Sequence, residues 1–283
     1  MEQSLSLFDL HIHSTYSDGL DGPDSLIDKI EAAGLAGFAL TDHETFDGIQ
    51  PIRERLAARK SALVFVPGIE FSTYVTGLGE IHLLGYFPDG GIEKLAEITD
   101  AGKKYRLERA SRIIDCLAGK GLKIDGDKLL SQKDKPIGRM HIARALVEHG
   151  YFDETQEAFR KYIGQGMPCY FPRRQLSPEE AITAVKEAGG ISSLAHPMFL
   201  SRTGNWAILE KFIKTGLNCI EYFHPKISRN LTLRIKAEME GRLLLTSGSD
   251  FHGDSRDNGL GFYGVDEEQL HTLFPTIRLL VRK

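Results

Sequence analysis

Short apolar runs alternate with helix-like segments at both ends of this chain, and this alternation is what most constrains its fold. Residues 1–90 read as strand, helix, strand, helix, strand and a return strand. The alternation resumes at residue 177, with helices expected at 178–188, 205–214 and 228–239 and strands at 191–195, 219–223 and 243–248. Such alternation is typical of an α/β fold with a parallel sheet or barrel, which residues 277–281 could close.

Residues 92–170 interrupt this pattern. Residues 92–117 read as a long polar helix, and residues 139–149 and 153–163 as two shorter ones. No convincing strand pattern lies between them. We therefore expect a barrel domain made of residues 1–91 and 171–283, interrupted by a mostly helical insertion, 92–170.

The apolar runs lead into histidines and acidic residues. Imidazole and carboxylate are ligands that Zn²⁺, Mn²⁺ and Fe²⁺ prefer. One ion takes only about four to six ligands, so this many candidates predict a cluster of ions. In a parallel barrel the carboxyl ends of the strands meet on one face, where active sites lie. The candidates are His11, His13, Asp18, Asp42, His43, Glu70, His82, His196, Asp250 and His252.

The spacing of these residues supports a shared site. His11 and His13 are two residues apart, so in a strand both side chains point to one face. The same holds for Asp250 and His252. Asp42 and His43 are adjacent and would face opposite ways, so we take His43 as a ligand and Asp42 as a partner that fixes the orientation of a ligand.

Each motif alone also has an ordinary structural explanation. An isolated Glu70 would be a solvated turn residue, and His82 could be a hydrogen-bonded core imidazole. Repetition favours the site, because six of the ten histidines lie at the ends of apolar runs. We expect His149, His224 and His271 to be surface or packing residues, although His224 follows a predicted strand and could reach the rim of the site.

Composition narrows the class of protein. The formal charge of −4 gives no sign of a broadly basic nucleic-acid surface, and no apolar run is long enough to span a membrane. The first residues lack the basic and apolar regions of a secretory signal, so a cytoplasmic location is expected. Three widely separated cysteines argue against a disulfide framework.

Taken together, the motifs resemble those of the PHP family, named for polymerase and histidinol phosphatase domains. DLHIHSTYSDG, TDH, PGIE, the histidine before LLGY, AHP and SDFH match the family's motifs in order. The resemblance implies a distorted (β/α)7 barrel that holds two or three divalent ions (Mn, Zn or Fe), with Glu70 bridging two of them. The implied metal ligands are His11, His13, Asp18, His43, Glu70, His82, His196, Asp250 and His252.

The insertion indicates which branch of the PHP family the chain resembles. IGRMHIARALVEHG is similar to a segment of stand-alone PHP phosphoesterases that act on nucleotides, a branch with nucleoside 3′,5′-bisphosphate phosphatases and a 5′–3′ exoribonuclease. In this chain Glu44 stands where the branch usually has aspartate, and Met140 where it usually has proline. Glu44 keeps the charge and lies outside the ligand set, whereas Met140 removes a fixed turn geometry next to Arg139 and His141.

The resemblance implies a metal-dependent phosphoesterase that hydrolyses a nucleotide phosphate ester with metal-activated water, the substrate being a nucleoside 3′,5′-bisphosphate or AMP-like. The insertion would cover the active site and bind the substrate through Arg106, Arg109, Arg139 and His141. The catalytic candidates are His196, His252 and His141. The alternative for the arginines is a solvated helix face with an ion pair between Glu108 and Arg112.

Other functions stay open. They are 5′–3′ exonuclease activity on short RNA, a histidinol-phosphate-type phosphatase, a non-catalytic PHP domain, and metal-dependent amide hydrolysis. The acidic charge favours a small nucleotide over RNA. The insertion motif counts against histidinol phosphate, and the complete ligand set counts against a non-catalytic domain. Neither a membrane nor an obligate protein partner is expected.

Overall fold

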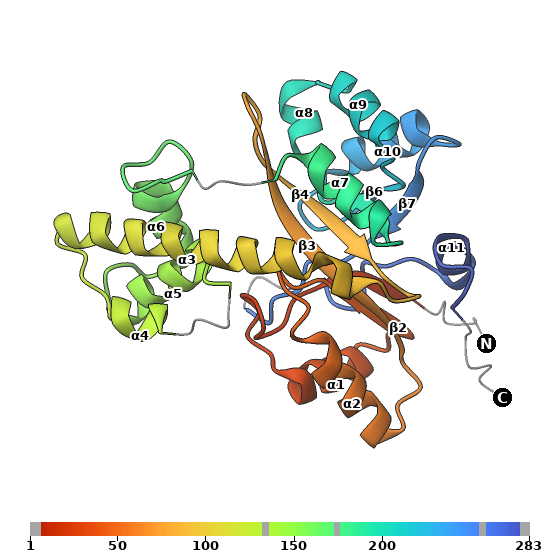
Figure 1. Cartoon of the computed structure of the whole chain (residues 1–283), viewed down its shortest axis with the longest axis horizontal. Coiled ribbons are helices and arrows are strands. Elements are labelled where there is room, and N and C mark those ends of the chain that lie inside the picture. The colour runs from red at the N-terminus through yellow and green to blue at the C-terminus, as the bar shows by residue number, and fades with distance from the viewer. Residues whose placement is uncertain (1–6, 132–135, 173–175, 255–258, 278–283) are drawn as a thin grey trace. The chain divides into compact units, whose positions relative to one another are not determined.

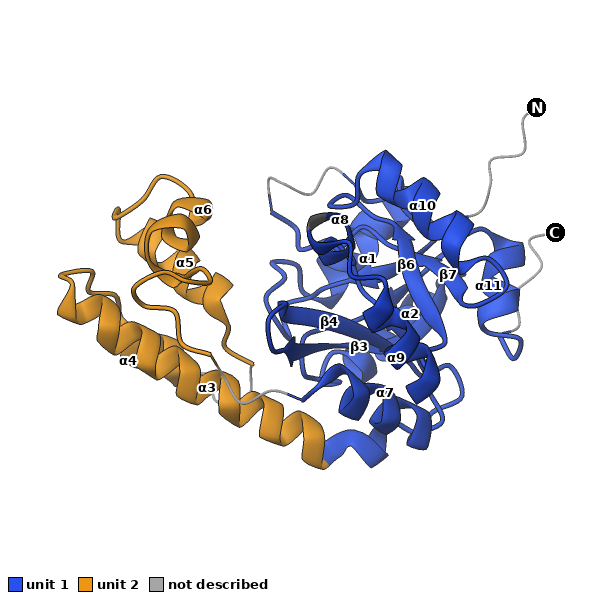
Figure 2. Cartoon of the chain, turned by 90° about the horizontal axis from the view of Figure 1, so that it is seen from above, with its two compact units in different colours: residues 1–96, 176–283 blue, residues 97–175 orange. Residues whose placement is uncertain are grey.

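The computed structural model describes residues 7–131, 136–172, 176–254 and 259–277. The chain divides into two compact units, coloured separately in Figure 2. Unit 1 comprises residues 1–96 and 176–283, and unit 2 comprises residues 97–175. The boundaries expected from the sequence lie between residues 91 and 92 and between residues 170 and 171. No helix among the described residues is both long and apolar enough to cross a membrane.

Unit 1 is built on a seven-stranded mixed sheet (Figure 1). Its strands lie side by side in chain order. Only β4 runs opposite to its neighbours, since the pairs β3–β4 and β4–β5 are antiparallel and the other pairs are parallel. The strands are β1 (Phe8–Ile12), β2 (Gly37–Leu40), β3 (Val64–Val75), β4 (Gly79–Tyr86), β5 (Ile191–Leu194), β6 (Cys219–Phe223) and β7 (Leu244–Ser247).

The segment that follows β7 pairs with the end of β1, so the two edges of the sheet meet. Ile12 forms a parallel bridge with Phe251, and the His13 backbone N–H donates to the Phe251 carbonyl at 2.9 Å. The Asp250 N–H donates in turn to the His11 carbonyl at 2.8 Å. These bonds bring the segment after β7 against the end of β1 and so confirm the predicted barrel class.

Helices connect the strands of unit 1. In α1, Leu26, Ile27 and Ile30 form a buried stripe with helical spacing. At α7 the Ser177 side chain accepts the Glu180 N–H while the Glu180 side chain accepts the Ser177 N–H, a reciprocal cap that fixes the helix start. The helices are α1 (Pro23–Ala32), α2 (Ile49–Arg59), η1 (Ile92–Leu95), α7 (Pro178–Glu187), α8 (Phe199–Thr203), α9 (Ala207–Thr215), α10 (Arg229–Met239) and α11 (Glu267–Leu273).

Helices are the only regular elements among the described residues of unit 2. It contains α3 (Ala96–Gly119), α4 (Gly126–Leu130), α5 (Arg139–Glu148), α6 (Thr155–Ala158) and the π-helical turn η2 (Phe159–Ile163). Ile113 and Leu117 of α3 pack with Ile142 and Leu146 of α5 in a core of its own. This separate core gives the insertion an internal source of stability.

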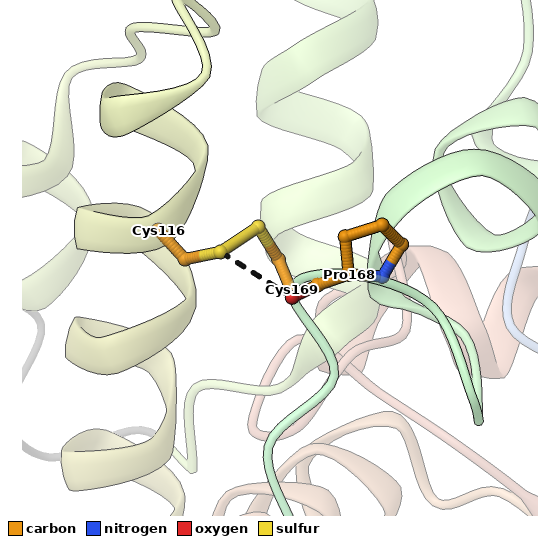
Figure 3. The surroundings of a disulfide bond; sticks show 3 residues. All are labelled: Cys116, Pro168 and Cys169. Atoms are coloured by element: carbon orange, nitrogen blue, oxygen red, sulfur yellow. Dashed lines mark hydrogen bonds between the residues drawn. A yellow bond between two sulfur atoms is a disulfide. The ribbon is translucent and has the colours of Figure 1, made fainter.

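A disulfide between Cys116 of α3 and Cys169 lies in unit 2 (Figure 3), so the expectation of no disulfide is wrong. The two residues are 53 positions apart in the chain, yet their Cα atoms lie 5.7 Å from each other. Cys169 is buried in the core of unit 2 and Cys116 packs against that core, which brings them together. Linear spacing shows no such pairing, because tertiary packing creates it.

Three other local expectations differ from the structure. The helix expected at 205–214 is preceded by the separate short helix α8, and the long helix expected from residue 92 begins as a 3₁₀ turn. Helix α11 was not predicted, although Asp266 caps it by accepting the Gln269 N–H at 2.8 Å. Ile277 packs against the barrel core, and residues 278–281 of the proposed closing strand lie outside the described residues.

We predict that Phe38→Ala destabilises the barrel by about 3–5 kcal/mol, because it empties space that the core cannot refill. Phe38 is fully buried, and its ring centroid lies 5.1 Å from that of Phe65. Urea unfolding followed by tryptophan fluorescence and circular dichroism measures the change. Phe262→Ala is the matched control, because this ring is 64% exposed and should cost less than about 1 kcal/mol.

Thiol alkylation of denatured protein tests the disulfide. Without reductant, mass spectrometry should find one alkylated cysteine, the buried and free Cys219. After reduction, Cys116 and Cys169 should be alkylated too. Alkylation of all three cysteines in the unreduced protein would show that the pair is not oxidised under the conditions of isolation.

Candidate metal centre

The barrel brings the sequence-predicted ligands of unit 1 together at one end. His11 and His13 lie at the end of β1, and His196 and Asp250 follow β5 and β7. Glu70 lies within the long strand β3, where its backbone bridges to His43 after β2. His82 joins from near the start of β4, because an antiparallel strand begins at the end of the barrel where parallel strands finish.

Glu70 is the centre of this cluster. Its side chain is only 1% exposed, and nitrogens of five imidazoles surround its two oxygens. His11 Nε2 (3.5 Å), His13 Nε2 (3.2 Å) and His43 Nδ1 (3.2 Å) lie near Oε2, while His82 Nδ1 (2.8 Å) and His196 Nε2 (3.1 Å) lie near Oε1.

Asp250 is a second carboxylate of the cluster that faces candidate ligands. Its Oδ1 lies 3.5 Å from His11 Nε2 and 3.3 Å from His13 Nε2, so it faces the same two rings as Glu70. Asp18 Oδ1 lies 3.3 Å from His252 Nε2, and the His252 ring stacks on His13 with centroids 4.1 Å apart. The nine predicted ligands therefore form one continuous cluster.

The donor atoms fall into groups that fit divalent ions. One group is His11, His13, Glu70 and Asp250, another is His13, Asp18, His43 and His252, and another is His43, Glu70 and His82, each with ligand atoms within 4.8 Å of one another. Two ligands that bind one ion at about 2.1 Å with angles of 90–110° lie about 3.0–3.4 Å apart. The N···O separations of 3.2–3.3 Å from His13 to Glu70 and Asp250 match this spacing.

The pKa shifts in the cluster also fit a site for cations. Burial alone would raise the pKa of Glu70, but neighbouring imidazoles, first His43 and His82, hold it well below its ordinary value. Burial alone would lower the pKa of His13, but bonds to Asp250 and Glu70 raise it to about 10. His196 differs, because burial dominates there and lowers its pKa to about 4. Ionised carboxylates at this depth require nearby positive charge, which protonated imidazoles or bound cations supply.

Two of the candidate ligands have unusual backbone conformations. His196 has φ of 26° and Asp250 has φ of 54°, a region that residues other than glycine rarely adopt. Both residues follow a strand of the barrel and lead into the loops that line the cluster. Such strain is typical of functional sites, where the surrounding structure maintains it.

Two buried aspartates support the ligands without being among them. Asp42 accepts the Ser14 N–H at 2.8 Å and the Ser14 and Ser17 hydroxyl groups, and Ser17 Oγ lies 3.5 Å from His13 Nδ1. Asp42 is thus linked to the candidate ligand His13 through the Ser17 hydroxyl group. Asp9 accepts the backbone N–H groups of His11 and Ser249 at 3.1 and 3.0 Å, and burial raises its pKa to about 7.

The sequence reasoning missed Glu221 and Lys226 in this site, and it left two readings of His224 open. The structure agrees with the one in which His224 reaches the site, since this residue is buried with Nε2 3.5 Å from Asp250 Oδ2. Lys226 Nζ also contacts Asp250 Oδ2. A glutamate inside the apolar strand β6, followed by histidine three residues later, was the available signal.

The four candidate substrate residues of unit 2 lie around the start of α5. The guanidinium groups of Arg109 and Arg139 lie 5.3 and 5.6 Å from the ring centroid of Tyr170, and Arg109 Nε donates to the Phe171 carbonyl at 2.7 Å. His141 Nδ1 accepts the Gly138 N–H at 3.1 Å. Arg106 is buried, and its Nη1 lies beside Gly138.

Comparison with known proteins agrees with this geometry. The family model of the PHP domain matches residues 9–125. The chain is 33% identical over 254 residues to a 5′–3′ exoribonuclease of Haemophilus influenzae, covering 87% of this chain and 89% of the relative. It is 32% identical to a 3′,5′-nucleoside bisphosphate phosphatase of Chromobacterium violaceum, covering 86% of each chain.

A solved structure gives the same result. A protein of Bifidobacterium adolescentis, described as a metal-dependent phosphoesterase, superposes with a TM-score of 0.85 over 96% of each chain at 29% identity. The barrel, the order of its motifs and the similarity to relatives over most of their length agree with one another. The chain therefore belongs to the PHP family.

Proposed function

We propose that this protein hydrolyses a phosphate ester of a nucleotide, a nucleoside 3′,5′-bisphosphate or an AMP-like compound, at the cluster around Glu70. The observation that carries the proposal is the arrangement of five imidazoles around one buried carboxylate, at 2.8–3.5 Å. An arrangement so rich in imidazole and carboxylate ligand atoms favours divalent cations over a purely structural role.

The nine residues would hold two or three divalent ions of Mn, Zn or Fe. His11, His13, Glu70 and Asp250 form one group, and Asp18, His43 and His252 join His13 in a second. His82 and His196 meet the other oxygen of Glu70, which would make this carboxylate a bridge. Bound ions supply an activated water and neutralise the charge that develops on the phosphoryl group.

The proton for the leaving group needs a separate source. His196 and His252 are candidates, but a ring nitrogen that binds a metal cannot deliver a proton. We therefore favour His141 as the proton donor. Its Nδ1 accepts the Gly138 N–H, so in the neutral ring the proton resides on Nε2.

Arg106, Arg109 and Arg139 are our candidates for binding the part of the substrate that does not react. Guanidinium groups make paired hydrogen bonds to phosphate oxygens. The convergence of Arg109 and Arg139 on one aromatic ring supports them over a dispersed solvated face. The placement of unit 2 over the site stays a prediction.

A 5′–3′ exonuclease that acts on short RNA is the second candidate. Its support is the similarity to the exoribonuclease of Haemophilus influenzae. The formal charge of −4 favours the mononucleotide, because polynucleotide binding draws on a row of basic residues.

The metal centre makes a direct prediction for binding. Metal-free wild-type protein should take up two or three equivalents of Mn²⁺ or Zn²⁺, measured by elemental analysis after gel filtration. His13→Ala should lose at least one equivalent, because His13 contributes to two of the ligand groups. His149→Ala serves as control, since this exposed ring lies outside the ligand groups and hydrogen-bonds to the Ala145 carbonyl in its own helix turn. Equal metal content in wild type and His13→Ala would contradict the proposed centre.

Substrate class is tested by phosphate release with added Mn²⁺. Adenosine 3′,5′-bisphosphate should be hydrolysed faster than AMP or histidinol phosphate, and Asp250→Asn should lower kcat by at least about 100-fold, beyond the loss expected for an outer-shell partner. A chromatographic assay on 5′-phosphorylated short RNA runs in parallel. Faster cleavage of RNA would shift the assignment to the exonuclease, and inactivity on all substrates would contradict the nucleotide assignment.

The role of the arginines predicts a change in KM. Arg139→Ala should raise KM for the bisphosphate by about 10-fold to 100-fold, the effect of losing a charge-assisted hydrogen bond. Bound metal should stay at the wild-type level. Arg234→Ala is the control, because this half-exposed residue stacks on Trp206 of unit 1 and pairs only weakly with Glu238. An unchanged KM in Arg139→Ala would remove this arginine from the substrate site.

A further inference from the structure

Glu221 is a buried carboxylate that contacts two of the candidate ligands. It lies on β6 and is 1% exposed. Its Oε1 lies 3.2 Å from His11 Nδ1, and its Oε2 accepts the backbone N–H of His196 at 2.7 Å. One side chain thus connects the end of β1 with the loop after β5.

The contact with His11 determines which nitrogen of that ring carries the proton and which is free to bind a metal. If Nδ1–H donates to Glu221, the proton resides on Nδ1 and the lone pair on Nε2 is available. Nε2 is the nitrogen that lies 3.5 Å from both Glu70 and Asp250. A carboxylate behind a metal-binding imidazole fixes its tautomer and raises its basicity.

The contact with His196 acts on the backbone. His196 adopts φ of 26°, and its N–H bond to Glu221 is short. The preceding Ala195 N–H donates to the His82 carbonyl at 3.1 Å, so β4 and β6 hold this turn from two sides. In this conformation His196 Nε2 lies 3.1 Å from Glu70 Oε1.

His224 could suggest a different role, in which His11, Glu221 and His224 hold an ion of their own. Two observations favour positioning instead. Both oxygens of Glu221 already face nitrogen donors of other residues. His224 Nδ1 accepts the Lys226 N–H at 3.0 Å, which leaves the proton of the neutral ring on Nε2, the atom that faces the site.

We propose that Glu221 is a positioning residue of the metal centre, which orients the His11 ring with one oxygen and holds the His196 backbone with the other. This inference rests on the metal centre proposed above. Glu221 does not bind the ions itself, and its effect passes through the two histidines.

Glu221→Gln tests the proposal with little change in shape. The glutamine side chain has one acceptor oxygen and one donor amide, whereas both partners of Glu221 are donors. Whichever way the amide turns, one contact is lost. Affinity for Mn²⁺ and Zn²⁺, measured by chelator competition, should fall about 10-fold to 100-fold. The absorption spectrum of the Co²⁺-loaded protein should also change, because the ligand geometry changes.

Glu210→Gln is the matched control, since Glu210 is exposed and pairs with Arg242 on the surface. Circular dichroism of the metal-free proteins checks folding. Glu221→Asp keeps the negative charge but shortens the side chain by one methylene group, which moves the carboxylate away from His11 and His196. We therefore expect the same loss of metal affinity from this variant.

The results of these measurements distinguish a failure of the positioning role from a failure of the proposed metal centre. Wild-type protein that binds no ion would overturn the metal centre and, with it, the role of Glu221. Wild-type metal affinity and an unchanged Co²⁺ spectrum in Glu221→Gln would overturn the positioning role alone. If neither variant folds without metal, Glu221 supports the fold itself, and the positioning role is also overturned.

Discussion

The structure of the site depends on the need to balance negative charge in the interior of the barrel. Glu70 and Asp250 are both buried, and each lies within 3.5 Å of His11 and His13. A carboxylate removed from water is costly unless cations or hydrogen bonds compensate it. The barrel meets this need by directing several imidazoles at the same two carboxylates, which is also what a divalent ion requires of its ligands.

The fold achieves this convergence through one departure from a regular parallel barrel. β4 runs antiparallel to its neighbours, so His82 near its start lies at the same end as His196 after β5. The segment after β7 lies at the same end of the sheet, held there by the His13 N–H bond to the Phe251 carbonyl and the Asp250 N–H bond to the His11 carbonyl. The irregular backbone at Asp250 is held by its N–H bond to the His11 carbonyl, and that at His196 by its N–H bond to the Glu221 side chain.

Much of this arrangement could be predicted from the sequence, because it follows from local patterns. The polar residues stand at the ends of apolar runs, and strand β6 was expected at the residues where it is found. The barrel class and the PHP family were confirmed by the structure and the comparisons. The ligand set remains a proposal that the geometry supports.

The features that could not be predicted arise from contacts between distant segments. Glu221 reads in the sequence as one polar residue in an apolar strand, and only the barrel brings it to His11, 210 positions away. For the same reason the sequence left open whether His224 is a packing residue or reaches the site. Cys116 and Cys169 meet because the core of unit 2 folds α3 against a later loop, which no spacing rule reveals.

The most direct test of this account is the anomalous scattering of crystals grown with Mn²⁺. The account predicts two or three anomalous peaks in the cluster, at least one of them at bonding distance, about 2.0–2.3 Å, from an oxygen of Glu70 and a nitrogen of His13. Crystals of fully loaded protein with no peak beside Glu70, or with peaks only elsewhere, would contradict the central claim that this buried carboxylate organises a metal centre.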